Sequence, residues 1–278
     1  MPGQTAKKNI HLSGYYLGAS TTIACQHDQR FSFCTYTPKA ILEEGPEKYR
    51  LLVAVHSSDR DYQDIRMHFA DLAEKHKLVV LAPLFPSGIG DRNDNENYKY
   101  ISYQNIRFDL LLLQMVEEAA TLYNIDADRF SLFGFSGGAH FAHRFFYLHP
   151  RRLSALSVAA PGSVTLIDES RDWWVGTRDM EKVFGQCPDF PAMRQVPTQL
   201  LVGGADTNTN AITHQPGLGK WMPGANGAGV TRIDRLHTLH DNWKSRSLNV
   251  SLDKIPGVGH DCQPLVGSAA RFLAAHCY

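Results

Sequence analysis

Residues 130–138 read FSLFGFSGG, and this stretch decides the fold. Its first residues suit a strand that is buried on both faces of a sheet. Residues 134–138 then match the pattern G-x-S-x-G, and a predicted helix over residues 137–148 follows at once. A serine between a strand and a helix lies on a sharp turn with strained backbone angles, where flanking glycines avoid clashes with neighbouring backbone. We therefore predict that the Ser136 hydroxyl stands exposed at the end of a β-sheet.

Strand and helix patterns alternate along the rest of the chain. Strands are predicted at short apolar runs, which are residues 51–55, 78–82, 129–135, 153–160, 198–202 and 248–255. Helices are predicted where apolar residues recur at helical spacing, in residues 61–76, 105–123, 137–148 and 233–245. Such an alternation predicts an α/β fold with a mostly parallel twisted sheet and helices on both faces. Residues 21–26 and 30–35, around a polar turn, add an antiparallel hairpin at one edge.

The chain of 278 residues is predicted to form a single domain, residues 1–278, because no repeat or polar linker divides it. Residues 85–105 are rich in Gly, Asp, Asn and Tyr, and a loop of that length is often functional. Residues 162–196 interrupt the strand–helix alternation and are too short to hold a core of their own. We expect this insertion to be a small lid over the carboxyl edge of the sheet.

A serine nucleophile needs a base beside it and an acid that orients the base, and the chain supplies both. The apolar strand 198–202 runs into Asp206, and the strand 250–255 leads through PGVG to His260. The order serine, acid, histidine, with each residue just after a strand, is typical of one arrangement of the triad. We predict Ser136 as nucleophile, His260 as base and Asp206 as the acid.

Other residues compete for these roles. Asp168 also follows a predicted strand and is the second choice for the acid. Asp261 adjoins the predicted base and is expected to face solvent. His214 is either a substrate contact or an exposed loop residue, and the second interpretation is favoured. The structural alternative for Ser136 itself is a helix-capping serine in a glycine-rich turn.

An oxyanion hole requires two N–H groups that point at one position. We predict that the backbone of Gly137 supplies the first. The second is expected from the loop after the strand 51–55, where Ser57 and Ser58 both offer an N–H. His56 in the same turn is expected to be a structural hydrogen-bonding residue.

These motifs resemble those of the α/β-hydrolase superfamily. The likeness runs from residue 51 to the C-terminus, and residues 128–138 (DRFSLFGFSGG), 203–206 (GGAD) and 256–260 (PGVGH) are similar to the branch of polyhydroxybutyrate depolymerases and feruloyl esterases. The resemblance implies an α/β-hydrolase fold, a Ser136–His260–Asp206 triad, and hydrolysis of an ester or amide without metal or cofactor. Residues 56–58 read HSS where His-Gly is more usual, which leaves the second oxyanion donor the least defined residue.

Aromatic residues in the two long loops are candidates for the substrate pocket. Trp173 and Trp174 form either the core of the insertion or an aromatic wall beside the site, and Tyr98 is a candidate of lower weight, as are Tyr100 and Tyr103.

Histidines and cysteines provide no further site. The histidines on or next to two predicted helices lack an acidic or cysteine partner at metal-ligand spacing, so they are expected to lie on the surface or cap the helices: His140, His143, His149, His237 and His240. The five cysteines contain no C-x-x-C pair. Cys25 and Cys34 lie on the two arms of the predicted hairpin, where a disulfide would fit, but reduced buried thiols are favoured.

The charge balance predicts no polyanionic partner. Lys and Arg number 28 and Asp and Glu also 28, so we expect neither nucleic-acid nor membrane binding. No apolar run reaches the roughly 18 residues of a membrane span, and the polar residues 1–8 precede no signal-peptide core. A cytoplasmic protein is therefore expected, unless a leader has been removed. Nothing in the sequence indicates an oligomeric state.

The predicted activity is acyl transfer to water through an acyl-enzyme on Ser136. A small or oligomeric carboxylic ester is the expected substrate, because an activated leaving group makes the fewest demands on the site. The same triad would also serve an amide, a lactone, a polyester or a C–C bond. A non-catalytic binding protein on this fold is the less favoured alternative.

Overall fold

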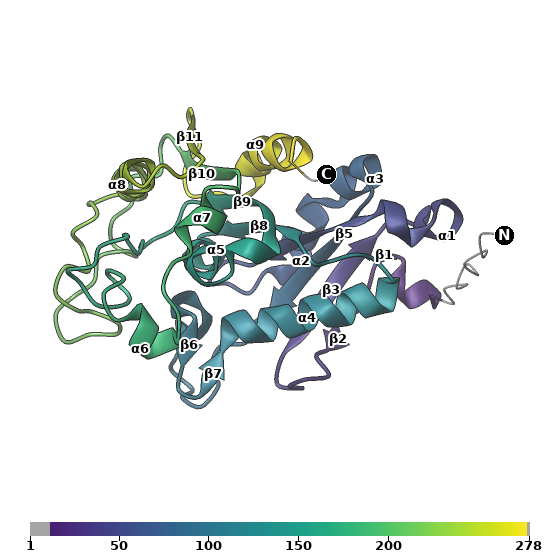
Figure 1. The fold of residues 1–278 in the computed structure, drawn as a ribbon, viewed down its shortest axis with the longest axis horizontal. Helices are drawn as coiled ribbons and strands as arrows, with labels where there is room; N and C mark the ends of the chain where they lie inside the picture. The colour runs from purple at the N-terminus through teal and green to yellow at the C-terminus, as the bar shows by residue number, and fades with distance from the viewer. Residues whose placement is uncertain (1–11, 277–278) are drawn as a thin grey trace.

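The computed structural model describes residues 12–276, and a nine-stranded sheet runs through it (Figure 1). The strand order is β1-β3-β5-β4-β8-β9-β10-β11, and β2 pairs with β3. The bounds are β1 Gly18–Ala19, β2 Ile23–Ala24, β3 Ser32–Thr37, β4 Arg50–Val55, β5 Leu78–Leu84, β8 Phe130–Phe135, β9 Leu153–Ala159, β10 Thr198–Gly203 and β11 Val250–Ile255. All pairs from β5 to β11 are parallel, whereas β1, β2 and β5 pair antiparallel with β3. The mostly parallel sheet and its antiparallel edge hairpin are confirmed.

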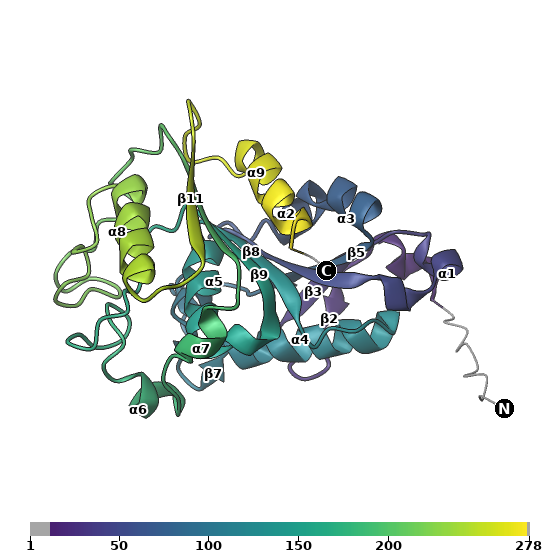
Figure 2. The same ribbon diagram turned by 45° about the horizontal axis from the view of Figure 1, so that its top comes forward.

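Helices cover both faces of the sheet, as predicted (Figure 2). One face carries α2 (Tyr62–His68), α3 (Ala70–His76) and α9 (Gln263–Ala274), and the other α4 (Phe108–Tyr123), α5 (Gly137–Leu148) and α8 (Arg232–Ser245). The indole of Trp243 joins α8 to α5, with its ring 5.4 Å from that of Phe146. Short elements fill the connections: η1 Gly14–Tyr16, α1 Ile41–Glu44, η2 Pro46–Lys48, η3 Asn97–Tyr100, β6 Ser102–Tyr103, β7 Ile106–Arg107, η4 Pro150–Arg152, α6 Met180–Phe184 and α7 Phe190–Met193.

The central strands are buried because helices flank them on both sides. Every residue of β8 is buried, and so is every residue of β4 except Arg50. Continuous apolar runs are what a sheet with two covered faces requires. Because β8, β10 and β11 run parallel, their carboxyl ends lie at one edge of the sheet, where the loops that follow them meet.

Two helices differ from the sequence-based prediction. The helix predicted over residues 61–76 is divided at Phe69, whose backbone angles of φ −105° and ψ 8° separate α2 from α3. The buried Phe69 ring packs 4.9 Å from Phe133, and this contact explains why it turns inward between the helices. Helix α4 begins at Phe108 rather than at residue 105, because β7 pairs with β6 just before it. The C-terminal helix α9 was not predicted.

The cysteines are free thiols in the described part of the chain. Cys25 donates its Sγ–H to Glu118, and Cys34 donates to the carbonyl of Tyr62, so the hairpin holds no disulfide. Cys277 and the N-terminal residues 1–8, for which no signal peptide is predicted, lie outside the described residues.

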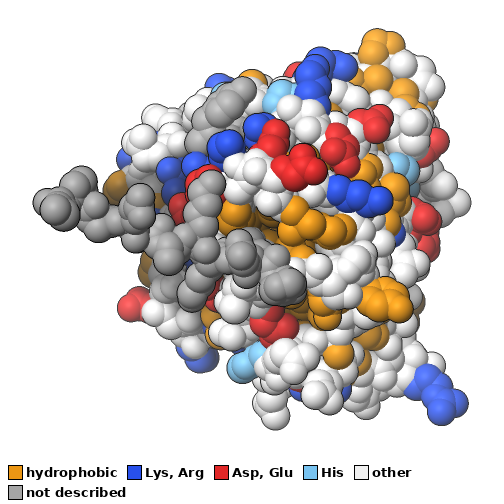
Figure 3. All heavy atoms as spheres, turned by 90° about the vertical axis from the view of Figure 1, so that its right-hand side faces the viewer, with side chains coloured by type: hydrophobic (Ala, Val, Ile, Leu, Met, Phe, Trp, Pro, Cys, Tyr) orange, Lys and Arg blue, Asp and Glu red, His pale blue; other side chains and the backbone are white. Residues whose placement is uncertain are grey.

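Surface charge is mixed on the end of the molecule drawn at the right of Figure 1. Basic and acidic side chains alternate there with hydrophobic ones (Figure 3), as the balanced charge leads one to expect. Among residues 12–276, no helix combines the length and the apolar character that a membrane span requires.

Candidate active site

Ser136 lies on the turn between β8 and α5, with φ 52° and ψ −111°. A non-glycine residue rarely adopts a positive φ, so the turn is strained. Glycines on either side allow it. A Cβ at Gly134 would collide with the carbonyl of Gly138, and a Cβ at Gly138 would collide with the carbonyl of Val55 on β4. The elbow can therefore form only because neighbouring backbones approach without side chains between them.

His260 and Asp206 join Ser136 in one chain of hydrogen bonds. The Nε2 atom of His260 lies 3.0 Å from the Ser136 Oγ, and its Nδ1 lies 2.7 Å from the Asp206 Oδ2. Asp206 is buried, whereas the His260 side chain is 28% exposed. The ring of His260 also stacks on Phe135 with 4.9 Å between centroids. The structure thus brings together the three residues that the sequence placed after β8, β10 and β11.

Backbone contacts hold the Asp206 and His260 loops together. The N–H of Gly204 donates to Ile255, and the N–H of Ala205 donates to Val258, at 2.7 and 2.8 Å. A Cβ at Gly203 would collide with the carbonyl of Val258. These backbone contacts hold the two loops together. The loops therefore position the Asp206 carboxylate and the His260 imidazole, in addition to the hydrogen bond between the two side chains.

Arg232 contacts the second oxygen of Asp206 and was missed in the sequence analysis. Its Nη1 donates to the Asp206 Oδ1 at 3.0 Å, and both side chains are nearly inaccessible. Burial would raise the pKa of Asp206, but the hydrogen bond from His260 and the charge of Arg232 outweigh it and hold that pKa below its ordinary value. No spacing rule points to an arginine at the first position of α8, 26 residues beyond the acid.

The loop after β4 offers one free N–H beside Gly137. The Ser57 N–H already donates to the Asp61 carboxylate at 2.9 Å, while the Ser58 N–H has no acceptor among the described residues. A Cβ built on Gly137 would lie 3.0 Å from the Ser58 nitrogen, so these two residues face the same small space. Of the two predicted alternatives, the geometry favours Ser58 over Ser57.

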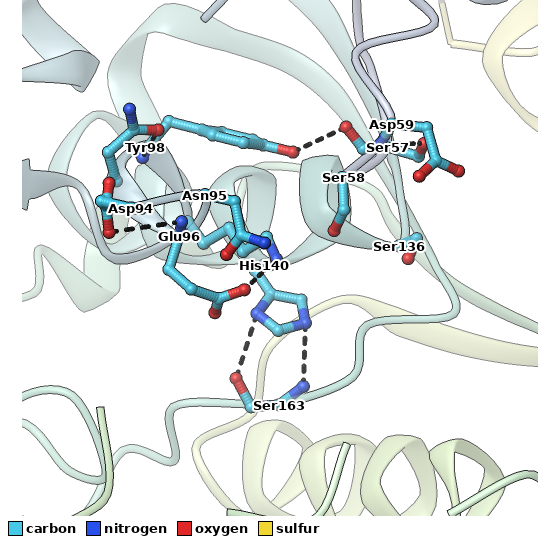
Figure 4. A network of polar contacts seen from close by, with 12 residues as sticks. Ser57, Ser58, Asp59, Asp94, Asn95, Glu96, Tyr98, Ser136, His140 and Ser163 are labelled. Carbon is cyan, nitrogen blue, oxygen red and sulfur yellow. Dashed lines mark hydrogen bonds and ion pairs between the residues drawn. The ribbon is translucent and has the colours of Figure 1, made fainter. Parts of the chain in front are cut away.

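Tyr98 and His56 support this loop through hydrogen bonds, and Figure 4 shows the Tyr98 hydroxyl directed at the loop. The Tyr98 hydroxyl donates to the carbonyls of His56 and Ser57 at 3.1 and 3.0 Å, and its ring is fully buried. The His56 Nδ1–H donates to the carbonyl of Ser57, and its Nε2 accepts from the N–H of Phe85. Burial lowers the pKa of His56 to about 4, so it stays neutral. Tyr98 is therefore a support for the loop, and its predicted place in the substrate pocket is wrong.

A cavity of about 470 Å³ opens beside Ser136 and His260. Nearly half of its lining residues come from the segment between β10 and α8, which contributes Ala211, Ile212, Thr213, His214, Gln215, Leu218, Gly219 and Lys220. The predicted lid, residues 162–196, contributes only Gly162. The segment that contributes the most lining residues is thus a loop from which the sequence analysis named only His214.

Trp173 and Trp174 do not line this cavity. Trp174 is 5% exposed and packs with Tyr100, and its indole N–H donates to the carbonyl of Lys220. Trp173 packs on Phe184 and donates to the carbonyl of Tyr100. Of the two interpretations left open, the structure favours a small core that joins the insertion to the neighbouring loops. Tyr103 is half-buried and also lies outside the cavity lining.

The two competing acids make other contacts, and His214 lines the cavity. Asp168 pairs with Arg171 at 3.3 Å and makes no contact with His260, and Asp261 accepts the N–H of Gln263. His214 lines the cavity, contrary to the favoured interpretation, and its ring lies 4.8 Å from that of Trp174.

The expectation that His140 and His143 lie on the surface is wrong. Both are buried, because the start of the insertion crosses α5 and their rings accept its N–H groups. The His140 Nε2 accepts from Ser163, and the His143 Nε2 accepts from Thr165, each at 3.0 Å. Within residues 12–276, no cluster of three or more His, Cys, Asp or Glu side chains could hold a metal ion.

Solved structures share this arrangement of strands and helices. The LpqC poly(3-hydroxybutyrate) depolymerase of Bordetella parapertussis is 22% identical, with 86% of this chain and 84% of that chain covered and a TM-score of 0.68. Poly(aspartic acid) hydrolase-1 of Sphingomonas sp. KT-1 is 20% identical, with 87% and 92% covered and a TM-score of 0.69. The siderophore hydrolase EstA of Aspergillus nidulans is 14% identical, with 92% and 93% covered and a TM-score of 0.57.

Neither a protein-family model nor a curated protein sequence matches the chain. The structural likeness nevertheless establishes the fold, and the chain has the α/β-hydrolase fold that its motifs predicted.

Proposed function

We propose that this protein is a serine hydrolase that cleaves a carboxylic ester through an acyl-enzyme on Ser136. The observation that carries the proposal is the unbroken hydrogen-bond chain from Ser136 through His260 to Asp206 at the wall of a cavity. A serine hydroxyl becomes nucleophilic when a base accepts its proton, and the base must be oriented by a third group. The structural neighbours are named as hydrolases and a depolymerase, and these names support a hydrolytic reaction.

The proposed cycle has two half-reactions, and His260 acts first as base and then as acid in each. His260 takes the proton of Ser136 as the hydroxyl attacks the carbonyl carbon, and it then gives that proton to the leaving alcohol. The N–H groups of Gly137 and Ser58 stabilise the oxyanion of the tetrahedral intermediate. Water then attacks the acyl-enzyme while His260 takes its proton. As the bond between the acyl group and the Ser136 Oγ breaks and the carboxylic acid leaves, His260 returns the proton to the Oγ, and Asp206 holds the imidazole in place throughout.

The first experiment combines an ester series with a covalent probe. We expect hydrolysis of p-nitrophenyl esters from acetate upward, and a single fluorophosphonate adduct that mass spectrometry of peptides assigns to Ser136. Ser136→Ala should lose both the turnover and the adduct. Labelling without ester turnover would favour amide, polyester or C–C chemistry at the same triad. A protein with neither activity nor label would contradict the proposal and leave a binding protein on this fold.

Replacing Arg232 tests whether it positions Asp206. In Arg232→Met we expect kcat/KM to fall about tenfold to a hundredfold, because a charge-assisted hydrogen bond contributes about 1.5–3 kcal/mol. The acidic limb of the pH profile should also move to higher pH. The folded pKa of Asp206 is depressed, so ionisation is favoured at neutral pH and is lost as pH falls through that pKa. Without the guanidinium, the carboxylate of Asp206 binds a proton at higher pH.

The matched control is Lys244→Met, which removes an exposed cation from the same helix, α8. Both pH profiles are measured with p-nitrophenyl acetate. An Arg232→Met profile that falls in height without moving along the pH axis would contradict the electrostatic role and indicate packing alone.

A further inference from the structure

One part of the cavity wall carries a buried lysine. Lys99 is 6% exposed and lines the cavity, and its Nζ donates to the Glu96 carboxylate at 2.5 Å. An ammonium group has three protons to donate, and Glu96 is the only acceptor for them among the described residues. Glu96 itself is partly exposed, at 35% of its side chain. Figure 4 shows the Glu96 carboxylate directed into the space beside His140.

Two buried arginines lie behind this wall without carboxylate partners. Arg144 donates to the carbonyl of Lys99 at 2.7 Å and to hydroxyl groups of the insertion. Arg235 donates to the carbonyls of Gly162 and Ile212, which both line the cavity. Neither guanidinium forms an ion pair within residues 12–276. Their contacts are with hydrogen-bond acceptors and, for Arg144, with the rings of Tyr100 and Trp174.

The balance of charge in this part of the cavity is therefore positive. Three buried cations lie here, Lys99 in the wall and Arg144 and Arg235 behind it, and the carboxylate in this part of the lining is that of Glu96. Burial and then the charges of Arg144 and Lys99 lower the pKa of His140, so this lining histidine stays neutral and adds no charge.

The other charges at the cavity do not alter this balance. Arg232 is neutralised by Asp206. Asp59 is exposed at the rim, on the far side of Ser58 from His140 (Figure 4). Lys220 also contributes to the lining, but its Nζ lies over the ring of Tyr103, outside the lining, so its charge is not counted here.

We propose that this part of the cavity binds an anionic group of the substrate, and that the preferred ester carries a carboxylate in addition to the bond that is cleaved. Lys99 donates to this carboxylate directly and shares its protons between it and Glu96. The guanidinium groups of Arg144 and Arg235 add long-range attraction, which persists because the wall excludes water. The inference rests on the serine hydrolase proposed above for the same cavity.

The test compares esters that differ in charge but share a leaving group. Mono-p-nitrophenyl glutarate is the anionic substrate and p-nitrophenyl valerate the neutral one, and the ratio of their kcat/KM values cancels changes common to both. In the wild type we expect kcat/KM to be about ten times higher for the anionic ester than for the neutral one, because one charge-assisted hydrogen bond gives a preference of about that size. Lys99→Met should lower the ratio at least about fivefold, and Glu96→Gln should raise it, because it removes the competing carboxylate.

A second substrate pair places the charge on the alcohol part of the ester. The butyrate ester of 4-hydroxybenzoate is the anionic member, and the butyrate ester of 4-hydroxybenzamide is the neutral one. A preference for the anionic member in either pair supports the proposal. Lys75→Met removes an exposed cation from α3, on the opposite face of the sheet, and should leave both ratios unchanged. Ratios at or below one, or ratios that Lys99→Met does not alter, would overturn it.

Binding separates this inference from the proposed reaction. Ligand-observed NMR with the Ser136→Ala protein compares monomethyl glutarate with methyl valerate, and no turnover is needed. Tighter binding of the anionic ester, weakened by Lys99→Met, would support the anion site even if no ester were hydrolysed. If Ser136→Ala bound the two esters equally and the wild-type protein hydrolysed both p-nitrophenyl esters, the serine hydrolase proposal would stand and the anion-site proposal would be contradicted.

Discussion

Replacing Asp206 by Asn should lower kcat for p-nitrophenyl esters by about 10⁴, because it reverses the tautomer of the base. Arg232 donates to the Oδ1 of Asp206, so it requires an acceptor at that position. In the variant, the amide oxygen turns toward Arg232 and the amide NH₂ faces the Nδ1 of His260. The imidazole then carries its proton on Nε2, where it cannot accept the proton of Ser136.

The control for this prediction is Asp168→Asn, which removes the second candidate acid and should change kcat by less than about twofold. A sharper check combines the two residues that hold the carboxylate. In Arg232→Met/Asp206→Asn the amide is free to present its oxygen to His260, so the double variant should be several times more active than Asp206→Asn alone. A double variant that is less active than either single one would show that the amide orientation is not the cause.

The sequence predicted the elements that local rules determine. The G-x-S-x-G elbow, the strands on either side of it and the order of Asp206 and His260 all follow from chain-local patterns: apolar runs, glycines and the residue after each strand. In a parallel sheet the carboxyl ends of neighbouring strands share one edge. Positions along the chain were therefore enough to bring Ser136, Asp206 and His260 together.

What the sequence did not predict depends on contacts between distant segments. Arg232 reaches the acid only because α8 folds back beside the loop after β10. His140 is polar and lies on a helix, so it was assigned to the surface, yet the insertion covers it and satisfies its nitrogens through Ser163. Tyr98 is aromatic and lies in a long loop, but its hydroxyl satisfies two carbonyls of the oxyanion loop instead of facing the cavity.

Replacing Gly137 by Ala should lower kcat about 10²–10³-fold, because the added methyl group occupies the proposed oxyanion hole. The new Cβ would lie 3.0 Å from the Ser58 nitrogen, and it would also press on the Tyr98 hydroxyl that supports the loop. The loop must move away, and the second N–H donor moves with it. The loss should appear in kcat rather than in KM, since the oxyanion exists only in the transition state and the intermediate.

Ser58→Ala is the matched control, because it deletes the hydroxyl and keeps the N–H. We expect this variant to retain kcat within about threefold, since the proposed donor is the backbone group. Circular dichroism and thermal melting of both variants show whether the fold is retained, and fluorophosphonate labelling reports whether Ser136 remains reactive. If Ser58→Ala lost as much activity as Gly137→Ala, the side-chain hydroxyl would be the donor. If neither lost activity, the stabilising groups would lie elsewhere, because the N–H groups of Gly137 and Ser58 could not then be what lowers the barrier.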